Sequence, residues 1–306
     1  MQTASLHNLS LMRRARAVCL LVWCCLWAAA VRPLGAQEVV AVISSDLAPY
    51  REAYQGFETA LALPVTQVNL QTGRPRIGRD SRVVVAFGGK AAMEEYPRDL
   101  TVIYCMAPGT TLNTDQRQGP TIRINMLPVA GKVVDALSDL QPSLRHLAVL
   151  WVTDTMTDYV TGLQQVGGEA GLEIAAERLR DPDQLPDSLR RLIGRKVEAL
   201  WVPPDPLLIN ASSFAVLREF SRANKIPLYA ATAGFAEEGA VAAVGVSFAQ
   251  NGRTAAETVL AVLAGQKVAP EVYPDECEIT LNLGAAAEIG LHFSSGIQSR
   301  AHKIIP

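Results

Sequence analysis

A serine between an apolar run and a helical pattern is the residue whose surroundings suggest nucleophilic chemistry. Ser247 lies in the segment Gly245-Val-Ser-Phe-Ala249, and Asp275 and His292 follow it in the order that α/β-hydrolases use. Alanine stands where a nucleophile elbow has its second glycine, and no HGGG-type run offers an oxyanion hole. A helix cap is the simpler interpretation of Ser247, and an exported serine hydrolase is the alternative.

Other motifs for catalysis or cofactor binding do not occur in the sequence. The GxGxxG dinucleotide fingerprint is absent, and the Walker-like glycine spacing at residues 73–78 is followed by Arg-Asp instead of Lys and Ser/Thr. Beyond the N-terminal region the histidines are His146, His292 and His302, whose spacing fits no metal site. We therefore expect no cofactor, no metal and no enzyme activity.

Small or polar residues follow several short apolar runs, a pattern typical of parallel strands with a ligand crevice at their carboxyl ends. Gly88 and Gly89 come between such a run and a helix, and Ser44 and Ser45 follow the first run of the mature chain. Free backbone N–H groups and the helix dipole at these places would suit a carboxylate. A plain tight turn would explain the same residues.

Four further side chains have two interpretations each. Asp205 could pair with a ligand amine, or it could cap a helix or form a turn between its flanking prolines. Tyr50, Tyr159 and Phe235 could stack on an apolar ligand, or they could belong to the core or its rim.

The N-terminal residues predict export. Three arginines between Arg13 and Arg16 precede an uncharged apolar stretch at 17–31, which is short for a membrane span. Leu34-Gly-Ala36 supplies small residues for cleavage before Gln37. We expect a signal peptide at 1–36 and a periplasmic location, with a retained N-terminal anchor as the alternative.

The size and charge of the mature chain limit its number of domains and its class of partner. Removal of 36 residues from 306 leaves 270 with a net charge of −6, because the leader contains four arginines and no acid. That length suits two domains, and a mildly acidic chain without basic runs argues against nucleic acid. Cys105 and Cys277 remain, either as free thiols or as a disulfide.

Alternating strands and helices predict an α/β fold with two Rossmann-like lobes, each on a parallel sheet. The expected ranges are 38–43, 65–70, 82–87, 101–106, 121–126, 144–152, 172–179, 200–202, 228–231, 241–246 and 278–283 for strands, and 49–62, 129–140, 185–196, 211–224, 250–264 and 284–291 for helices, with further helices after Gly89 and Thr153.

Two such series meet near residues 125–130 without a flexible linker, so we expect lobes at 37–126 and 127–246. The tail 247–306 is expected to return to the first lobe, which would give a hinge of several crossings near Asn125, Ser247 and Thr280.

Five segments resemble the substrate-binding proteins of ABC-type importers, in the type I periplasmic-binding-protein family that includes tryptophan- and tyrosine-type binders. The resemblance covers roughly residues 120–291, whereas the first half is short. Its segments are Trp201-Val-Pro-Pro-Asp205, Lys225-Ile-Pro227, Glu238-Gly-Ala-Val-Ala-Ala-Val-Gly-Val246, Gly252-Arg-Thr-Ala-Ala-Glu257 and Asn282-Leu-Gly-Ala-Ala286.

The resemblance implies a monomer that captures a small molecule, amino-acid-like or otherwise bearing a carboxylate, and delivers it to a membrane permease. A sensory protein that signals to a receptor is the alternative. The ligand would lie between the lobes at the strand ends, against Ser44, Ser45, Gly88, Gly89, Met106, Ala107, Thr153, Thr155, Asp205, Ala231 and Thr232.

Overall fold

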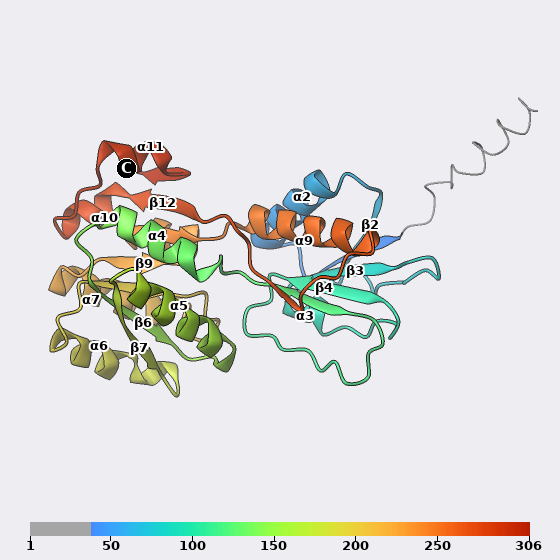
Figure 1. Cartoon of the computed structure of the whole chain (residues 1–306), viewed down its shortest axis with the longest axis horizontal. Helices are drawn as coiled ribbons and strands as arrows, with labels where there is room; N and C mark the ends of the chain where they lie inside the picture. The colour runs from blue at the N-terminus through green and yellow to red at the C-terminus, as the bar shows by residue number, and fades with distance from the viewer. Residues whose placement is uncertain (1–37) are drawn as a thin grey trace, which may run out of the picture. The chain divides into compact units, whose positions relative to one another are not determined.

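The computed structural model describes residues 38–306, which fold into two α/β lobes (Figure 1). The predicted leader, with its cleavage site after Ala36, lies outside the described residues. Each lobe is built on its own sheet, so the predicted α/β class with two Rossmann-like lobes is confirmed.

The sheet of the first lobe is parallel throughout. Its order is β11-β5-β4-β3-β1-β2, in which the first five strands of the chain have the doubly wound order 2-1-3-4-5. The strands are β1 (Val39–Ile43), β2 (Val65–Asn69), β3 (Val83–Phe87), β4 (Thr101–Cys105), β5 (Thr121–Ile124) and β11 (Glu271–Val272).

The sheet of the second lobe repeats this order and then adds two strands of opposite direction. Its order is β13-β12-β10-β9-β8-β6-β7, and β12 pairs with β10 antiparallel. The strands are β6 (His146–Trp151), β7 (Glu173–Arg178), β8 (Ala199–Val202), β9 (Leu228–Ala230), β10 (Ala242–Gly245), β12 (Glu278–Asn282) and β13 (Lys303–Ile305).

Central strands such as β1, β3, β4 and β8 are buried throughout, on both faces of their sheets, which explains why they are largely apolar runs. In β1, Val39, Ala41 and Ile43 face one core, whereas Val40 and Val42 face the core on the opposite side of the sheet. The same alternation divides β6 and β8 between the two cores of the second lobe.

Helices cover these faces unequally. The first sheet has α2 (Ala48–Leu61) and α9 (Phe248–Leu263) on one face but only α3 (Gly89–Ala92) on the other. The second sheet is covered on both faces, by α4 (Ala130–Leu140), α5 (Thr157–Glu169), α10 (Leu283–Glu288) and α11 (Ser295–Arg300) on one, and by α6 (Leu185–Ile193) and α7 (Ala211–Asn224) on the other.

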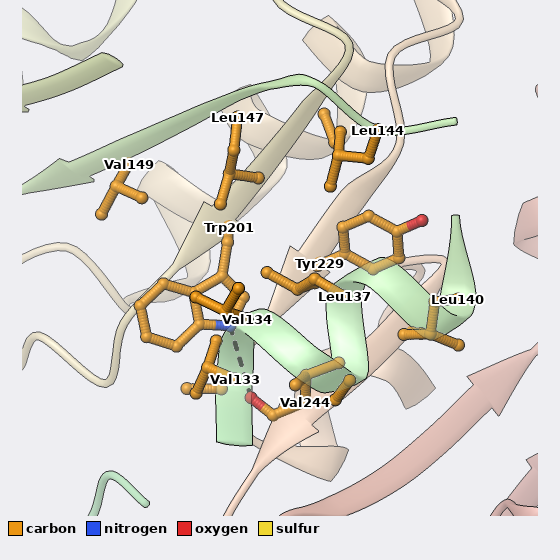
Figure 2. Close-up of a cluster of buried hydrophobic side chains, with 14 of the residues drawn as sticks. Val133, Val134, Leu137, Leu140, Leu144, Leu147, Val149, Trp201, Tyr229 and Val244 are labelled. Atoms are coloured by element: carbon orange, nitrogen blue, oxygen red, sulfur yellow. Dashed lines mark hydrogen bonds between the residues drawn. The ribbon is translucent and has the colours of Figure 1, made fainter. Parts of the chain in front are cut away.

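The core under α4 centres on Trp201 of β8, which is fully buried. Figure 2 shows its indole among aliphatic side chains of α4 and β6, with Nε1 donating to the carbonyl oxygen of Val244 at 3.3 Å. The hydrogen bond satisfies the one polar atom that this large apolar side chain brings into the interior.

The chain passes between the lobes three times, through a first crossing segment at 125–129, a second at 246–247 and a third at 273–277. The expected return of the whole tail 247–306 needs correction. Only α9 and β11 join the first lobe, whereas β12 and β13 extend the second sheet because β10 offers them an unpaired edge. Thr280 therefore pairs with Ala243 inside a sheet and is not a hinge residue.

Four short elements were not predicted, because each is too short to show a period in the sequence. They are β11, α11, β13 and α8 (Ala233–Glu237). The predicted bounds of α7 agree with the structure, and the other predicted elements differ by a few residues at their ends.

Helices α2 and α9 lie side by side in Figure 1 and pack without intervening side chains. A Cβ atom on Gly252 would stand 1.8 Å from the carbonyl oxygen of Ala53, and one on Gly56 would stand 2.2 Å from that of Ala249. The two backbones are thus closer than any side chain at these positions allows, and this contact holds α9 in the first lobe.

We predict that Gly252→Ala destabilises the protein by about 1–3 kcal/mol or more, because the added methyl must push two helix backbones apart. Gly162→Ala, in a part of α5 where a Cβ meets nothing within 4 Å, is the control and should stabilise by about 0.5–1 kcal/mol. Urea unfolding of both variants measures the difference. Equal stability of Gly252→Ala and the wild type would contradict this packing.

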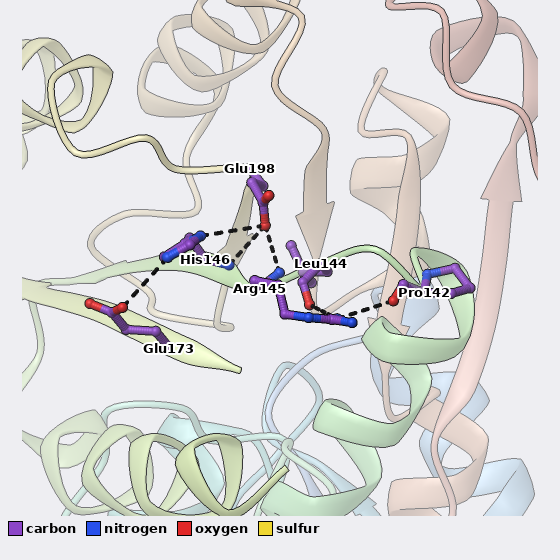
Figure 3. Close-up of polar contacts among 6 residues, drawn as sticks. All are labelled: Pro142, Leu144, Arg145, His146, Glu173 and Glu198. Atoms are coloured by element: carbon purple, nitrogen blue, oxygen red, sulfur yellow. Dashed lines mark hydrogen bonds and ion pairs between the residues drawn. The ribbon is translucent and has the colours of Figure 1, made fainter. Parts of the chain in front are cut away.

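Glu198 joins the amino ends of β6 and β8 (Figure 3). Its Oε2 accepts hydrogen bonds from the backbone N–H groups of Arg145 at 2.5 Å and of His146 at 2.9 Å. The bond from Arg145 is the main cause that lowers the pKa of Glu198 below its usual value of 4.5. The folded state therefore stabilises the charged carboxylate more than the unfolded state does.

Because the pKa of Glu198 is lowered in the folded state, its carboxylate contributes fully to the free energy of unfolding above pH 4.5. This contribution is lost as the pH falls through the lowered pKa. We predict that Glu198→Gln lowers the free energy of unfolding near neutral pH and that this difference shrinks in acid. Glu173→Gln is the control, since Glu173 makes only an exposed ion pair with His146. A difference that does not depend on pH would refute the assignment.

Candidate functional site

The strand order of each sheet reverses at one place, between β1 and β3 in the first lobe and between β6 and β8 in the second. Ligands of doubly wound sheets bind outside the carboxyl ends of the strands at such a place. The predicted site residues of the first lobe follow β1, β3 and β4, and those of the second follow β6, β8 and β9. Within each lobe the structure brings them together on adjacent strands.

The glycine turn after β3 serves the fold of the first lobe. Gly88 has a φ of +95°, and a Cβ there would lie 2.6 Å from Oγ of Ser44 and 2.7 Å from Cε1 of Tyr50. Ser44 is buried, and its Oγ accepts the backbone N–H of Ala91 at 2.9 Å. Ser44 therefore uses one of the donors at this helix start, and binding of a carboxylate at the turn stays a prediction.

The remaining predicted residues of the first lobe differ in surroundings. Ser45 and Gly89 are half-buried, and a Cβ on Gly89 would approach Oγ1 of Thr110 at 3.2 Å. Met106 is buried with a φ of +55°, unusual for a side chain of its size, and Ala107 is buried beside it.

Asp205 requires the clearest correction, because its carboxylate is completely buried and already saturated. It accepts hydrogen bonds from the backbone N–H groups of Val152, Thr153 and Leu207 at 2.7, 2.6 and 2.9 Å, and from the Thr153 hydroxyl at 2.7 Å. A ligand amine finds no free oxygen there. Thr153 correspondingly gives its hydroxyl to Asp205 and does not cap the helix that follows.

We predict that Asp205→Ala lowers stability by about 3 kcal/mol or more, because buried donors from two strand ends lose their acceptor together. Asp154→Ala is a matched control at the same strand end, since Asp154 is exposed and pairs only with Arg178. Thermal and urea unfolding compare the two variants. If Asp205→Ala folds as stably as Asp154→Ala, Asp205 does not hold these strand ends.

The other predicted residues of the second lobe are not saturated in this way. Ala231 is buried, and its N–H donates to the carbonyl oxygen of Val202 at 3.0 Å. Thr232 is half-buried and makes no side-chain cap on α8. Thr155 has a buried Oγ1 with no hydrogen-bond partner among the described residues.

A cavity of about 20 Å³ lies between the lobes at the first crossing segment. This is about the space of one water molecule. The loop after β4 closes it, since a Cβ on Gly109 would stand 2.9 Å from Cγ of Pro206 and 3.4 Å from Cγ2 of Thr153 in the second lobe. Its lining comes from both lobes and comprises Ala107, Pro108, Gly109, Arg123, Ile124, Asn125, Met126, Leu127, Met156 and Pro204.

Two lining residues carry buried donor atoms without a partner among the described residues. They are Nε of Arg123 and Nδ2 of Asn125. Sequence reasoning missed Arg123 and considered Asn125 only as a hinge position, because both lie at the end of a strand without a glycine or serine after it. Only the adjacency of β11 and α9, far away in the sequence, turns this strand end into a site.

The amide of Asn251, in the first turn of α9, joins the crossing segments to the loop that lines the cavity. Its Oδ1 accepts the N–H of Met106 at 3.2 Å, and its Nδ2 donates to the carbonyl oxygen of Asn125 at 2.6 Å. The N–H of Asn125 in turn donates to the carbonyl oxygen of Val272 at 2.9 Å, at the end of β11. One buried side chain thus connects the starts or ends of all three crossings.

Tyr159 has a related role, and its burial fits the interpretation as a core residue. It is buried on α5, donates its hydroxyl to the carbonyl oxygen of Pro128 at 2.9 Å, and stacks on Tyr273 with ring centroids 5.8 Å apart. It therefore holds the first and third crossing segments together, and burial raises its pKa well above the ordinary value. Phe235 packs on Phe214 in the second-lobe core.

Ser247 is a helix cap, as its simpler interpretation predicted. Its Oγ accepts the N–H of Gln250 at 3.1 Å and donates to Oε1 of Glu278 at 2.6 Å. Cys105 and Cys277 are free thiols. In residues 38–306 no helix is both long and apolar enough to cross a membrane, and no cluster of acidic, histidine or cysteine side chains could hold a metal ion.

The sequence matches a family model described as ABC transporter substrate binding protein over residues 124–305. A tyrosine-binding protein of Clostridioides difficile is 26% identical over 155 residues, which is 49% of this chain and 44% of that protein. The chain therefore spans about half the length of the curated relative that it matches.

Solved structures share the fold at lower identity. An ABC domain of Streptococcus pneumoniae in complex with L-Trp has a TM-score of 0.59 at 18% identity, over 87% of this chain and 99% of that one. A substrate-binding protein with adhesive properties from Clostridium difficile, in its ligand-free, open form, has a TM-score of 0.63 at 17% identity, over 88% and 99%.

Proposed function

The chain belongs to the ABC transporter substrate-binding protein family, and we propose that it captures an amino-acid-like solute between its lobes and delivers it to a membrane permease. The observation that carries this proposal is the cavity at the first crossing segment, which both lobes line. A ligand that contacts both lobes binds the closed arrangement more tightly and shifts the population toward it.

Three properties of the described residues support binding without chemistry. The strand-end carboxylate Asp205 and the serine Ser247 are held in structural hydrogen bonds, and the cavity contains neither a thiol nor a histidine.

The relatives named as binding L-Trp or tyrosine make aromatic amino acids the first ligands to examine. Export to the periplasm and a monomeric state are part of the same proposal, since family members work next to a permease.

The experiment is a thermal-shift and calorimetric screen of the natural amino acids, beginning with L-tryptophan and L-tyrosine. A ligand at 100 times its dissociation constant should add about 2.7 kcal/mol of stability. Gly109→Ala should weaken binding, because its methyl group meets Pro206 when the lobes approach.

Gly171→Ala is the matched control, since Gly171 has the same left-handed backbone conformation but a Cβ there meets nothing within 4 Å. Both variants share the backbone strain, so only the contact across the cavity distinguishes them. Solute capture fails as a proposal if no amino acid stabilises the protein. The interlobe site fails if both variants bind a ligand equally well.

A further inference from the structure

We propose that Arg123 and Asn125 form a carboxylate-binding subsite at the first crossing segment, and that the solute is recognised by its acid group far more than by its amine. The inference rests on the proposed function, because it assigns the group of the captured solute that enters this cavity. It relocates the acid from the strand ends of the first lobe to the hinge.

The two donor atoms are buried, belong to residues that line the same cavity and have no partner among the described residues. Asn125 is 8% exposed, so its unpaired Nδ2 lies almost completely within the protein. The side chain of Arg123 is 16% exposed, and its Nε is buried while Nη2 forms an ion pair with Glu271. Buried donors left without an acceptor are costly, and at a cavity a ligand group or an ordered water can satisfy them.

The surrounding hydrogen bonds fix both residues in position. Asn125 is held through its N–H by Val272 and through its carbonyl oxygen by Asn251. The N–H of Arg123 donates to the carbonyl oxygen of Pro270 at 2.8 Å, and Glu271 accepts a hydrogen bond from Tyr273 at 3.0 Å in addition to its pair with Arg123. The backbones of both residues are therefore fixed, and the ion pair with Glu271 fixes the guanidinium of Arg123, which lowers the cost of ordering this part of the site on binding.

A carboxylate matches this pair of donors. Each of its oxygens can accept one N–H, and hydrogen bonds to a charged acceptor are about twice as strong as neutral ones. An ammonium group instead donates hydrogen bonds and needs acceptors. No lining residue of the cavity is acidic, and Asp205, next to the lining residue Pro204, already accepts four hydrogen bonds. An amine there would lose its hydration without gaining a charged partner.

Three compounds with one indole ring separate these contributions, namely L-tryptophan, indole-3-propionate without the amine and tryptamine without the carboxylate. By calorimetry we expect tryptamine to bind about 10- to 100-fold more weakly than L-tryptophan, as the loss of charged hydrogen bonds requires. Indole-3-propionate should stay within about 10-fold of L-tryptophan.

Asn125→Asp replaces the donor by a negative oxygen at nearly equal size. The variant should bind indole-3-propionate about 10- to 100-fold more weakly than the wild type and should bind tryptamine more tightly. Loss of a merely structural asparagine would not invert the preference in this way. Thr121→Val is the control, because Thr121 lies on the same strand with a buried unpaired hydroxyl but does not line the cavity. It should bind all three compounds as the wild type does.

The outcomes distinguish this inference from the proposed function. Equal binding of tryptamine and L-tryptophan by the wild type, or unchanged binding of acids by Asn125→Asp, overturns the subsite and leaves solute capture intact. Binding of none of the three compounds counts against the capture of aromatic solutes and overturns the subsite with it. The comparison of the three compounds uses the wild-type protein. It therefore tests the carboxylate subsite even where a variant does not fold.

Discussion

The hydrogen bonds of one buried amide fix the place where the chain leaves the first lobe. Asn251 holds Met106 and Asn125, and Asn125 holds Val272, so the end of β11, the start of α9 and the first crossing segment meet at one point. A motion at this point moves the loop that lines the cavity. In the proposed function the hinge and the ligand site are therefore one structure, and a ligand bound to Asn125 acts directly on the segment about which the lobes would turn.

The strand ends, in contrast, are occupied by the protein itself. Ser44 satisfies an N–H of α3, and Asp205 satisfies the donors that end β6. These internal hydrogen bonds make the switch points rigid, as a platform for a ligand needs. Buried side-chain donors without a partner among the described residues occur at the end of β5, on Arg123 and Asn125, and after β6, on Thr155.

Much of the fold could be predicted because the central strands are buried on both faces, which makes runs such as residues 39–43 apolar without interruption. The family resemblance also rested on such local segments. The site could be predicted less well, because the occupancy of Asp205 depends on Thr153, 52 residues away, and the surroundings of Asn125 depend on α9. A local pattern identifies a strand end but not whether its polar groups are already used.

The packing of α9 on α2 has a consequence for the way the protein acquires its structure. Every strand from β6 to β10 lies in the sequence between α2 and α9, whose backbones approach closely at Gly56 and Gly252 in the finished fold. Closing so long a loop is slow and entropically costly. During synthesis β1, β3 and β4 have one apolar face partly bare until most of the chain exists. The first lobe cannot be a unit that folds before the second, and a fragment ending at residue 124 would expose the surface that α9 covers.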